Sequence, residues 1–211
     1  MKGFNSLYEK YGLSFDQTYQ DICLLLDLPE VRPQTLHEKS KWAMAEIEGI
    51  CGGPFVFYGG GKVTFKTENA EYSANSMAEG FRKAGILSRL LETGAIQPGV
   101  SGPLFWDEPE SNLNPKLMKL LVQILLELSR NGQQIILATH DYVLLKWFDL
   151  LMDKGKDDHV RFHSLYRDAD TSEIKVASTE DYLKITPNPI DEAFGFLINQ
   201  EIENDMGGLG K

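Results

Sequence analysis

Several features are scarce or missing in this 211-residue sequence, and each absence narrows the class of protein. The only two cysteines, Cys23 and Cys51, lack metal-ligand spacing, which favours reduced core thiols over a disulfide framework. No run of about 18 apolar residues predicts a membrane span, and the first residues lack the apolar segment of a signal peptide. We therefore expect a cytoplasmic protein with one sizeable core.

Positive charge is also scarce. The formal net charge of −10 argues against a general nucleic-acid-binding surface, because such surfaces are basic. A local basic patch formed by Arg82, Lys83 and Arg89 is the one place where the sequence leaves nucleic-acid contact open.

The most informative part of the sequence is a pair of apolar runs, each of which ends in polar side chains. Residues 104–107 end at Asp107, which Glu108 follows, and residues 135–138 are followed closely by His140. Short apolar runs bounded by turn signals are typical of buried parallel strands. The segment between them carries leucines at helical spacing. This order predicts a βαβ unit, in which the strand ends bring the two acids and the histidine to one edge of a sheet.

Four motifs now carry a resemblance to a known family. Residues 105–110 (FWDEPE) resemble the Walker B segment of ABC-type ATPases, residues 111–115 (SNLNP) their D-loop, and residues 139–141 (THD) their switch-histidine loop. Residues 77–83 (MAEGFRK) lie where the family has its signature motif. Together these motifs resemble the bacterial AAA-labelled, ABC-like ATPases, which are related to chromosome-maintenance (SMC) and DNA-repair ATPase heads. The resemblance covers roughly residues 55–151. It implies an α/β fold of the P-loop NTPase type, with an ABC-type sheet flanked by helices.

The resemblance implies ATP and Mg²⁺ as cofactors and a role for each polar residue. Asp107 would hold the Mg²⁺, often through water, since Mg²⁺ dehydrates reluctantly. Glu108 would orient and polarise the attacking water, and His140 would contact the γ-phosphate. The alternative roles are a capping or solvated carboxylate for each acid, and a hydrogen-bonded core histidine for His140.

The resemblance also implies that the signature region and the D-loop face the nucleotide of a partner subunit. A helix N-terminus suits a phosphate because its amides are unpaired. Gly80 aligns with the signature, but Ala78 stands where the family has serine, and Ser76 is the candidate substitute. Gly80 serves either close backbone approach or simply the start of the helix. Asn112 and Asn114 serve either as caps of the next helix or as contacts to the partner.

A phosphate-binding loop is missing from the site that these motifs imply. Such a loop needs the pattern G-x-x-x-x-G-K-[ST], whose amides cradle the phosphates. The only candidate, GGGKV at residues 59–63, has Val56 at the first glycine position and Val63 in place of the Mg²⁺-binding serine or threonine. The alternating residues that follow favour a strand, so a glycine turn is the preferred interpretation. The chain therefore resembles the C-terminal half of an ATPase: a truncated chain, a fragmentary gene product or one half of a split protein.

Periodicity divides the chain into segments. Residues 1–53 are expected to form a helical insertion, and residues 54–211 the C-terminal part of the ATPase domain, so that the fold is incomplete. A small antiparallel β layer is expected over residues 55–73. The other expected elements are helices at about 14–28, 34–50, 77–91, 116–130, 142–151 and 190–204, and strands at about 160–166 and 173–177 joined by a turn at Asp168.

The sequence thus predicts the C-terminal portion of a protein that binds and hydrolyses ATP across a dimer interface, in DNA repair or phage defence. Its expected partner is a second copy or the missing N-terminal half, and the chain alone is expected to be inactive. The alternatives are a non-hydrolysing regulatory module and a transporter-type ATPase subunit. The lack of an LSGGQ-like signature weighs against the transporter type.

Overall fold

The computed structural model describes residues 16–58 and 62–208. The predicted glycine turn at residues 59–61 and the start of the chain lie outside the described residues. The chain forms two compact units, residues 1–137 and 138–211. Among the described residues, no helix has the length and apolar character needed to cross a bilayer.

The first unit holds the segments that precede the boundary at residue 137. They are α2 (Gln17–Leu26), α3 (Glu38–Cys51), β1 (Phe55–Phe57), β2 (Val63–Lys66), β3 (Glu71–Ser73), the 3₁₀ turn η1 (Ala74–Ser76), α4 (Glu79–Glu92), β4 (Leu104–Asp107), α5 (Pro115–Arg130) and most of β5 (Ile135–Ala138). The second unit holds α6 (Tyr142–Leu151), η2 (Lys154–Lys156), β6 (Phe162–Arg167), β7 (Ile174–Thr179), η3 (Tyr182–Lys184) and α7 (Pro189–Gly208).

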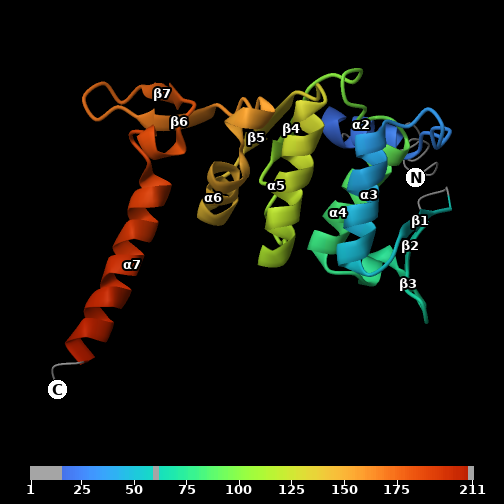
Figure 1. Cartoon of the computed structure of the whole chain (residues 1–211), viewed down its shortest axis with the longest axis horizontal. Helices are drawn as coiled ribbons and strands as arrows, with labels where there is room; N and C mark the ends of the chain where they lie inside the picture. The colour runs from blue at the N-terminus through green and yellow to red at the C-terminus, as the bar shows by residue number, and fades with distance from the viewer. Residues whose placement is uncertain (1–15, 59–61, 209–211) are drawn as a thin grey trace. The chain divides into compact units, whose positions relative to one another are not determined.

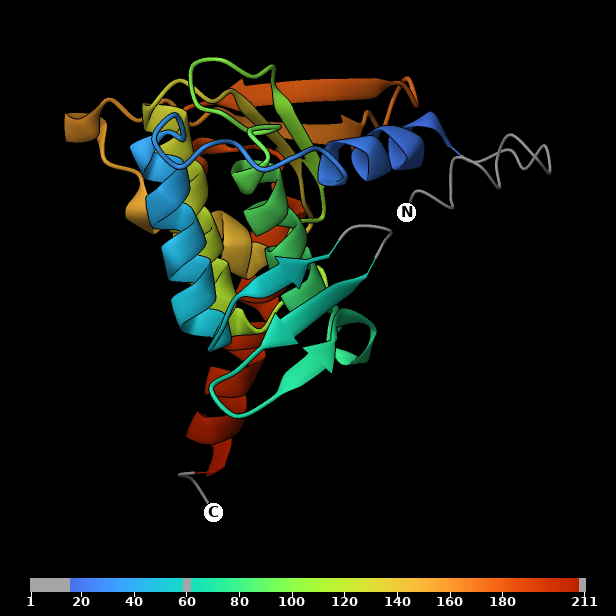
Figure 2. The same ribbon diagram turned by 90° about the vertical axis from the view of Figure 1, so that its right-hand side faces the viewer.

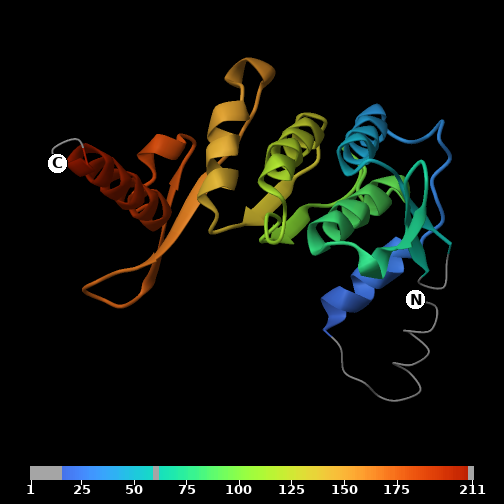
Figure 3. The same ribbon diagram turned by 90° about the horizontal axis from the view of Figure 1, so that it is seen from below.

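Helix α3 packs against both α4 and α5, and the three helices enclose the core of the first unit (Figures 1 and 3). The apolar stripe predicted for residues 116–130 is the buried side of α5. Its buried residues are Leu117, Met118, Leu121, Val122, Ile124, Leu125, Leu126 and Leu128. A polar contact supports the same packing, since Lys39 Nζ of α3 lies 2.6 Å from Glu127 Oε1 of α5. The hydrogen bond from Lys39 is the main reason why the pKa of Glu127 is lowered.

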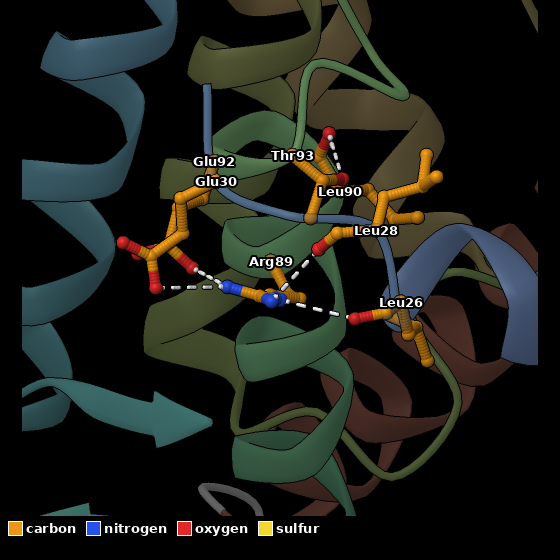
Figure 4. A network of polar contacts seen from close by, with 7 residues as sticks. All are labelled: Leu26, Leu28, Glu30, Arg89, Leu90, Glu92 and Thr93. Atoms are coloured by element: carbon orange, nitrogen blue, oxygen red, sulfur yellow. Dashed lines mark hydrogen bonds and ion pairs between the residues drawn. The ribbon is translucent and has the colours of Figure 1, made fainter. Parts of the chain in front are cut away.

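Arg89 ties α4 to the segment that follows α2 (Figure 4). Its side chain is only 7% exposed. Nε donates to the carbonyl of Leu26 at 3.1 Å, and Nη2 donates to that of Leu28 at 3.0 Å. Nη1 contacts the carboxylates of Glu92 at 2.6 Å and Glu30 at 3.3 Å. A buried guanidinium needs such partners because its desolvation is costly, so Arg89 fixes the path of residues 26–30.

The predicted antiparallel β layer is present. Strand β2 pairs with β1 and β3, with Phe55 opposite Phe65 and Thr64 opposite Ser73. The layer lies against α4, as Figure 2 shows. Phe65 is buried, and its ring lies 5.0 Å from that of Phe55 and 6.1 Å from that of Phe81 in α4. A Cβ at Gly85 of α4 would lie 2.8 Å from the Phe55 ring, so the close contact requires glycine there.

Strands β4 and β5 pair as predicted for a βαβ unit. The amide of Leu104 donates to the carbonyl of Gln134 at 2.9 Å, which joins the amino ends of both strands, as in a parallel pair. The prediction that both strands are buried is wrong. Phe105 is 70% exposed and Ile136 44% exposed, because alternate residues point to opposite faces and only the face of Trp106 lies against the helices.

The second unit has a small core of its own. Tyr182 is the largest fully buried side chain among the described residues of this unit; its ring lies 5.6 Å from that of Phe162, and Lys146 Nζ lies 4.8 Å from the ring centre. Strands β6 and β7 form the predicted antiparallel hairpin. Helix α7 runs to Gly208, beyond the end expected at about residue 204.

Candidate functional site

The candidate site is built on the carboxyl end of β4. The strand ends at Asp107, whose side chain is exposed. Glu108 follows, half-buried, with a φ of 44°, which is in the left-handed region that non-glycine residues rarely adopt. A residue held in such a conformation signals that the surrounding structure imposes it, and such residues cluster at active sites and ligand clamps.

Residues 108–114 form a loop of two consecutive turns before α5. The amide of Ser111 donates to the carbonyl of Glu108 at 3.1 Å, and the amide of Leu113 donates to that of Glu110 at 2.9 Å. Asn112 has a φ of 63°, a conformation that asparagine tolerates better than most residues. The Glu110 side chain is buried in this loop.

The two asparagines of this loop have different contacts. Asn114 caps α5, since its Oδ1 accepts from the amide of Lys116 at 3.0 Å, and Pro115 occupies the first helical turn. The capping alternative for Asn114 is therefore confirmed. Asn112 makes no such cap; its Nδ2 donates to Glu79 Oε2 in α4 at 2.9 Å. Contacts of either residue to a partner subunit stay a prediction.

The first turn of α4 lies directly against this loop. A Cβ on Gly80 would lie 2.5 Å from the carbonyl oxygen of Asn112 and 3.2 Å from Leu113 Cα. Gly80 therefore allows the close approach of α4 to this loop, and its two alternatives, approach to a nucleotide or the start of a helix, stay predictions. The resemblance expected a glycine at this place in order to approach a nucleotide; in the described structure it approaches the D-loop-like segment of the same chain.

Lys83, one helical turn further along α4, contacts the same loop. Its Nζ donates to the carbonyl of Glu108 at 3.0 Å and to Ser111 Oγ at 2.8 Å. The charged groups of Lys83 and of the buried Arg89 are thus engaged in contacts within the chain. The basic patch left open for Arg82, Lys83 and Arg89 is not formed, because only Arg82 is exposed.

The remaining signature candidate, Ser76, is exposed at the end of η1, before α4 begins. The N-cap of α4 is Ala78, which supplies no side-chain hydrogen bond to the first turn. Ser76 does not replace it as a cap. A binding role for Ser76 stays a prediction.

His140 belongs to the second unit, where it is exposed and lies two residues after β5. Its neighbour Asp141 caps α6, because Asp141 Oδ1 accepts from the amide of Leu144 at 2.6 Å. Because His140 is exposed, it is not a hydrogen-bonded core histidine. Its proposed contact with the γ-phosphate stays a prediction.

A role for Asp107 in holding Mg²⁺ stays a prediction. Within the described ranges, no group of three or more His, Cys, Asp or Glu side chains could hold a metal ion. A Mg²⁺ ion that serves phosphate chemistry commonly takes one or two carboxylates, several waters and phosphate oxygens. Asp107, exposed at a strand end, suits this arrangement as a single ligand.

Comparisons with known proteins agree with this description. Residues 65–146, which include every candidate site residue, match the family model described as "AAA domain, putative AbiEii toxin, Type IV TA system". No protein with a curated description matches the chain.

Three solved SMC structures are among those similar to the chain. The SMC head with coiled coil and joint from Pyrococcus yayanosii gives a TM-score of 0.50 at 16% identity, over 76% of this chain and 29% of that one. The SMC head domain from Thermotoga maritima gives 0.48 at 15%, over 76% and 51%. A structure described as "Structural biochemistry of ATP-driven dimerization and DNA stimulated activation of SMC ATPases" gives 0.47 at 12%, over 81% and 98%.

The chain is therefore similar to AAA-type, ABC-like ATPase domains related to SMC heads. Its fold is the P-loop NTPase fold of these heads, as the sequence predicted. It spans about half or less of the Thermotoga and Pyrococcus chains.

Sequence reasoning missed Lys83 and Glu79. Both lie in the segment identified as the signature motif, and Lys83 was otherwise considered only for a basic patch. The spacing of Lys83 from Gly80 was the available signal, because residues three apart share a helix face. If Gly80 packs closely against a segment, Lys83, on the same helix face, is expected to contact that segment too.

Proposed function

We propose that this chain is the C-terminal portion of an ATP-binding and ATP-hydrolysing head, related to SMC-type heads, that serves DNA repair or phage defence in the cytoplasm. The observation that carries the proposal is the conformation of Glu108. A glutamate at the carboxyl end of a Walker B-like strand has a left-handed backbone, and Lys83 of the signature-like helix donates both to its carbonyl and to Ser111 Oγ in the same turn. Such enforced strain is typical of functional residues.

The proposed roles follow from chemistry and position. Asp107 would hold Mg²⁺, which would offset the negative charge of the phosphates. Glu108 would orient and polarise the attacking water, the role of an acceptor placed near the nucleophile. His140 would donate a hydrogen bond to the γ-phosphate, where a donor matters most as charge develops.

The phosphate-binding loop would come from another segment. The two acids bring negative charge toward a polyanion, and the sequence has no G-x-x-x-x-G-K-[ST] loop to offset it. We therefore expect weak Mg²⁺-ATP binding by the 211-residue chain alone.

A second copy would complete the site from the other side. The N-terminus of α4, with Ser76 before it and no side-chain cap on its first turn, would face the γ-phosphate bound by the partner, together with Asn112 and Asn114. The completed protein would then dimerise with ATP at the interface.

The test supplies a segment with a Walker A loop, fused ahead of the chain or added in trans, and measures Mg²⁺-ATP binding by calorimetry and phosphate release at steady state. We expect binding and turnover to appear only in the combined sample. Asp107→Asn should weaken the Mg²⁺-dependent part of binding. Micromolar binding by the chain alone would contradict the proposal, and binding without any turnover in the combined sample would favour a non-hydrolysing regulatory module.

A further inference from the structure

The turn formed by residues 108–111 is stabilised by a hydrogen bond of its own backbone and by a side chain of α4. Inside the turn, the amide of Ser111 donates to the carbonyl of Glu108 at 3.1 Å. From outside, Lys83 Nζ donates to the same carbonyl at 3.0 Å and to Ser111 Oγ at 2.8 Å. One ammonium group thus bridges the first and last residues of the turn.

The stem of Lys83 is placed by packing. It lines a small apolar cavity of about 30 Å³ together with Trp106 and Pro109, which flank the two acids in sequence. Pro109 is buried, so the chain on the C-terminal side of Glu108 is fixed as well. A long side chain that buries its methylene groups and directs its charged end to defined acceptors loses little freedom when it binds them.

The contact acts on the residue whose backbone is strained. Glu108 has a φ of 44°, and a residue released from such a conformation relaxes toward the right-handed or extended regions. That relaxation rotates the Cα–Cβ bond and with it the direction of the carboxylate. The carbonyl that Lys83 holds belongs to the same residue, so the ammonium opposes this rotation directly.

We propose that Lys83 is a positioning residue for Glu108, acting from α4 through the backbone of the 108–111 turn. The inference rests on the proposed role of Glu108 in orienting water. Lys83 does not touch the nucleotide or the water in this proposal; it keeps the carboxylate aimed at them. The signature-like helix and the Walker B-like strand are thereby coupled within one chain.

The first measurement uses the 211-residue chain as it is. Hydrogen exchange is followed in the peptide that contains Ser111 and Leu113, with an α5 peptide as the reference for global stability. Lys83→Met keeps the stem and removes the ammonium, and we expect about tenfold faster exchange in the loop with the α5 peptide unchanged. Lys116→Met, an exposed lysine at the start of α5, is the matched control and should change neither peptide.

Two further variants keep this measurement decisive if Lys83→Met lowers stability as a whole. Lys83→Arg retains a donor and should restore most of the protection. Ser111→Ala removes one of the two acceptors of the ammonium and should produce a smaller increase confined to the loop. Loop exchange that is the same in all variants would overturn the proposal.

The second measurement uses the chain completed with a Walker A segment. Misplacement of a reacting group by about 1 Å can cost about 10²-fold in rate, so Lys83→Met should lower kcat by up to that factor. Nucleotide Kd should stay within about twofold, because the contact lies on the loop and not on the nucleotide, and Lys83→Arg should recover most of kcat. A general loss of structure would raise Kd as well.

The outcomes separate the two proposals. Faster loop exchange with unchanged kcat would show that Lys83 holds the loop without positioning a catalytic group, and would overturn the inference while leaving the proposed function intact. If the completed native protein hydrolyses no ATP, the proposed function fails, and the positioning role fails with it even where the exchange result holds.

Discussion

Two of the loops that contain left-handed non-glycine residues are held in opposite ways. The loop at residues 108–114, with left-handed Glu108 and Asn112, is held by another element, since Lys83, Glu79 and Gly80 of α4 all contact it. The hairpin turn after β6, with left-handed Ser172, is held by its own residues. Asp168 accepts from the amides of Asp170 and Thr171 and from the ammonium of Lys175.

The difference teaches where coupling arises. A turn that satisfies its own polar groups forms wherever its sequence occurs and transmits nothing to the rest of the protein. A turn whose strained residues are held by a distant helix depends on that helix, and any movement of the helix changes the turn. The loop at residues 108–114 is of the second kind, and it carries Glu108, which is proposed to orient the attacking water.

The largest effect should come from filling the contact at Gly80. Gly80→Ala places a Cβ 2.5 Å from the carbonyl of Asn112, so the loop or the helix must shift. Overpacking of this kind costs about 1–3 kcal/mol in the free energy of unfolding. Gly49→Ala in α3 is the control, because nothing lies within 4 Å of its added Cβ, and it should stabilise by about 0.5–1 kcal/mol. Urea denaturation of both variants measures the contrast; destabilisation by both would show that the Gly80 contact is not specific.

The left-handed backbone at Asn112 should give the next largest effect. Asn112→Ala places alanine at a φ of 63°, a conformation that costs alanine about 1–2 kcal/mol. The same change removes the hydrogen bond to Glu79. Asn112→Gly removes the same contact but adopts this backbone freely. Denaturation should therefore show a loss for alanine and little change for glycine. Equal losses would mean that the Glu79 contact, and not the backbone, decides the stability of the loop.

The N-cap at Asn114 should contribute somewhat less. Asn114→Ala removes the acceptor that serves the Lys116 amide, and such a change costs about 1 kcal/mol. Asn114→Ser keeps an acceptor at the N-cap and should retain most of the stability. Chemical denaturation of the two variants decides this, and an unchanged midpoint for Asn114→Ala would contradict the capping role.

The hairpin turn should respond to pH, and only locally. Hydrogen bonding to Lys175, followed by that from Thr171, lowers the pKa of Asp168 to about 2. The folded pKa lies below the ordinary value, so the contribution of Asp168 is present above about pH 4 and is lost as the pH falls through about 2. NMR titration of the hairpin amides should show this transition, and Asp168→Asn should abolish it while the loop at residues 108–114 is unaffected.

The sequence predicted the parts of this comparison that depend on local chemistry. Asparagine before proline predicted the cap of α5, and the run starting at Asp168 predicted the hairpin turn. The order of the motifs also predicted the P-loop NTPase fold. For the cap and the turn, the cause lies within a few residues of the effect.

The parts that the sequence did not predict depend on contacts between distant segments. Lys83 and Ser111 are far apart in the chain, and neither residue type indicates the other. The apolar run of β4 predicted burial on both faces, but a run of apolar residues cannot say which face is covered. Arg89 was placed in a surface patch, and only the path of residues 26–30 shows why it is buried.

The account depends most directly on Glu108. In the chain completed by a Walker A segment, phosphate release and nucleotide binding should be measured side by side for the native protein and for Glu108→Gln, which keeps the shape of the side chain and removes its charge. General base catalysis is worth about 10²–10⁴ in rate, so turnover should fall by that order while ATP remains bound. Full turnover by Glu108→Gln would contradict the account.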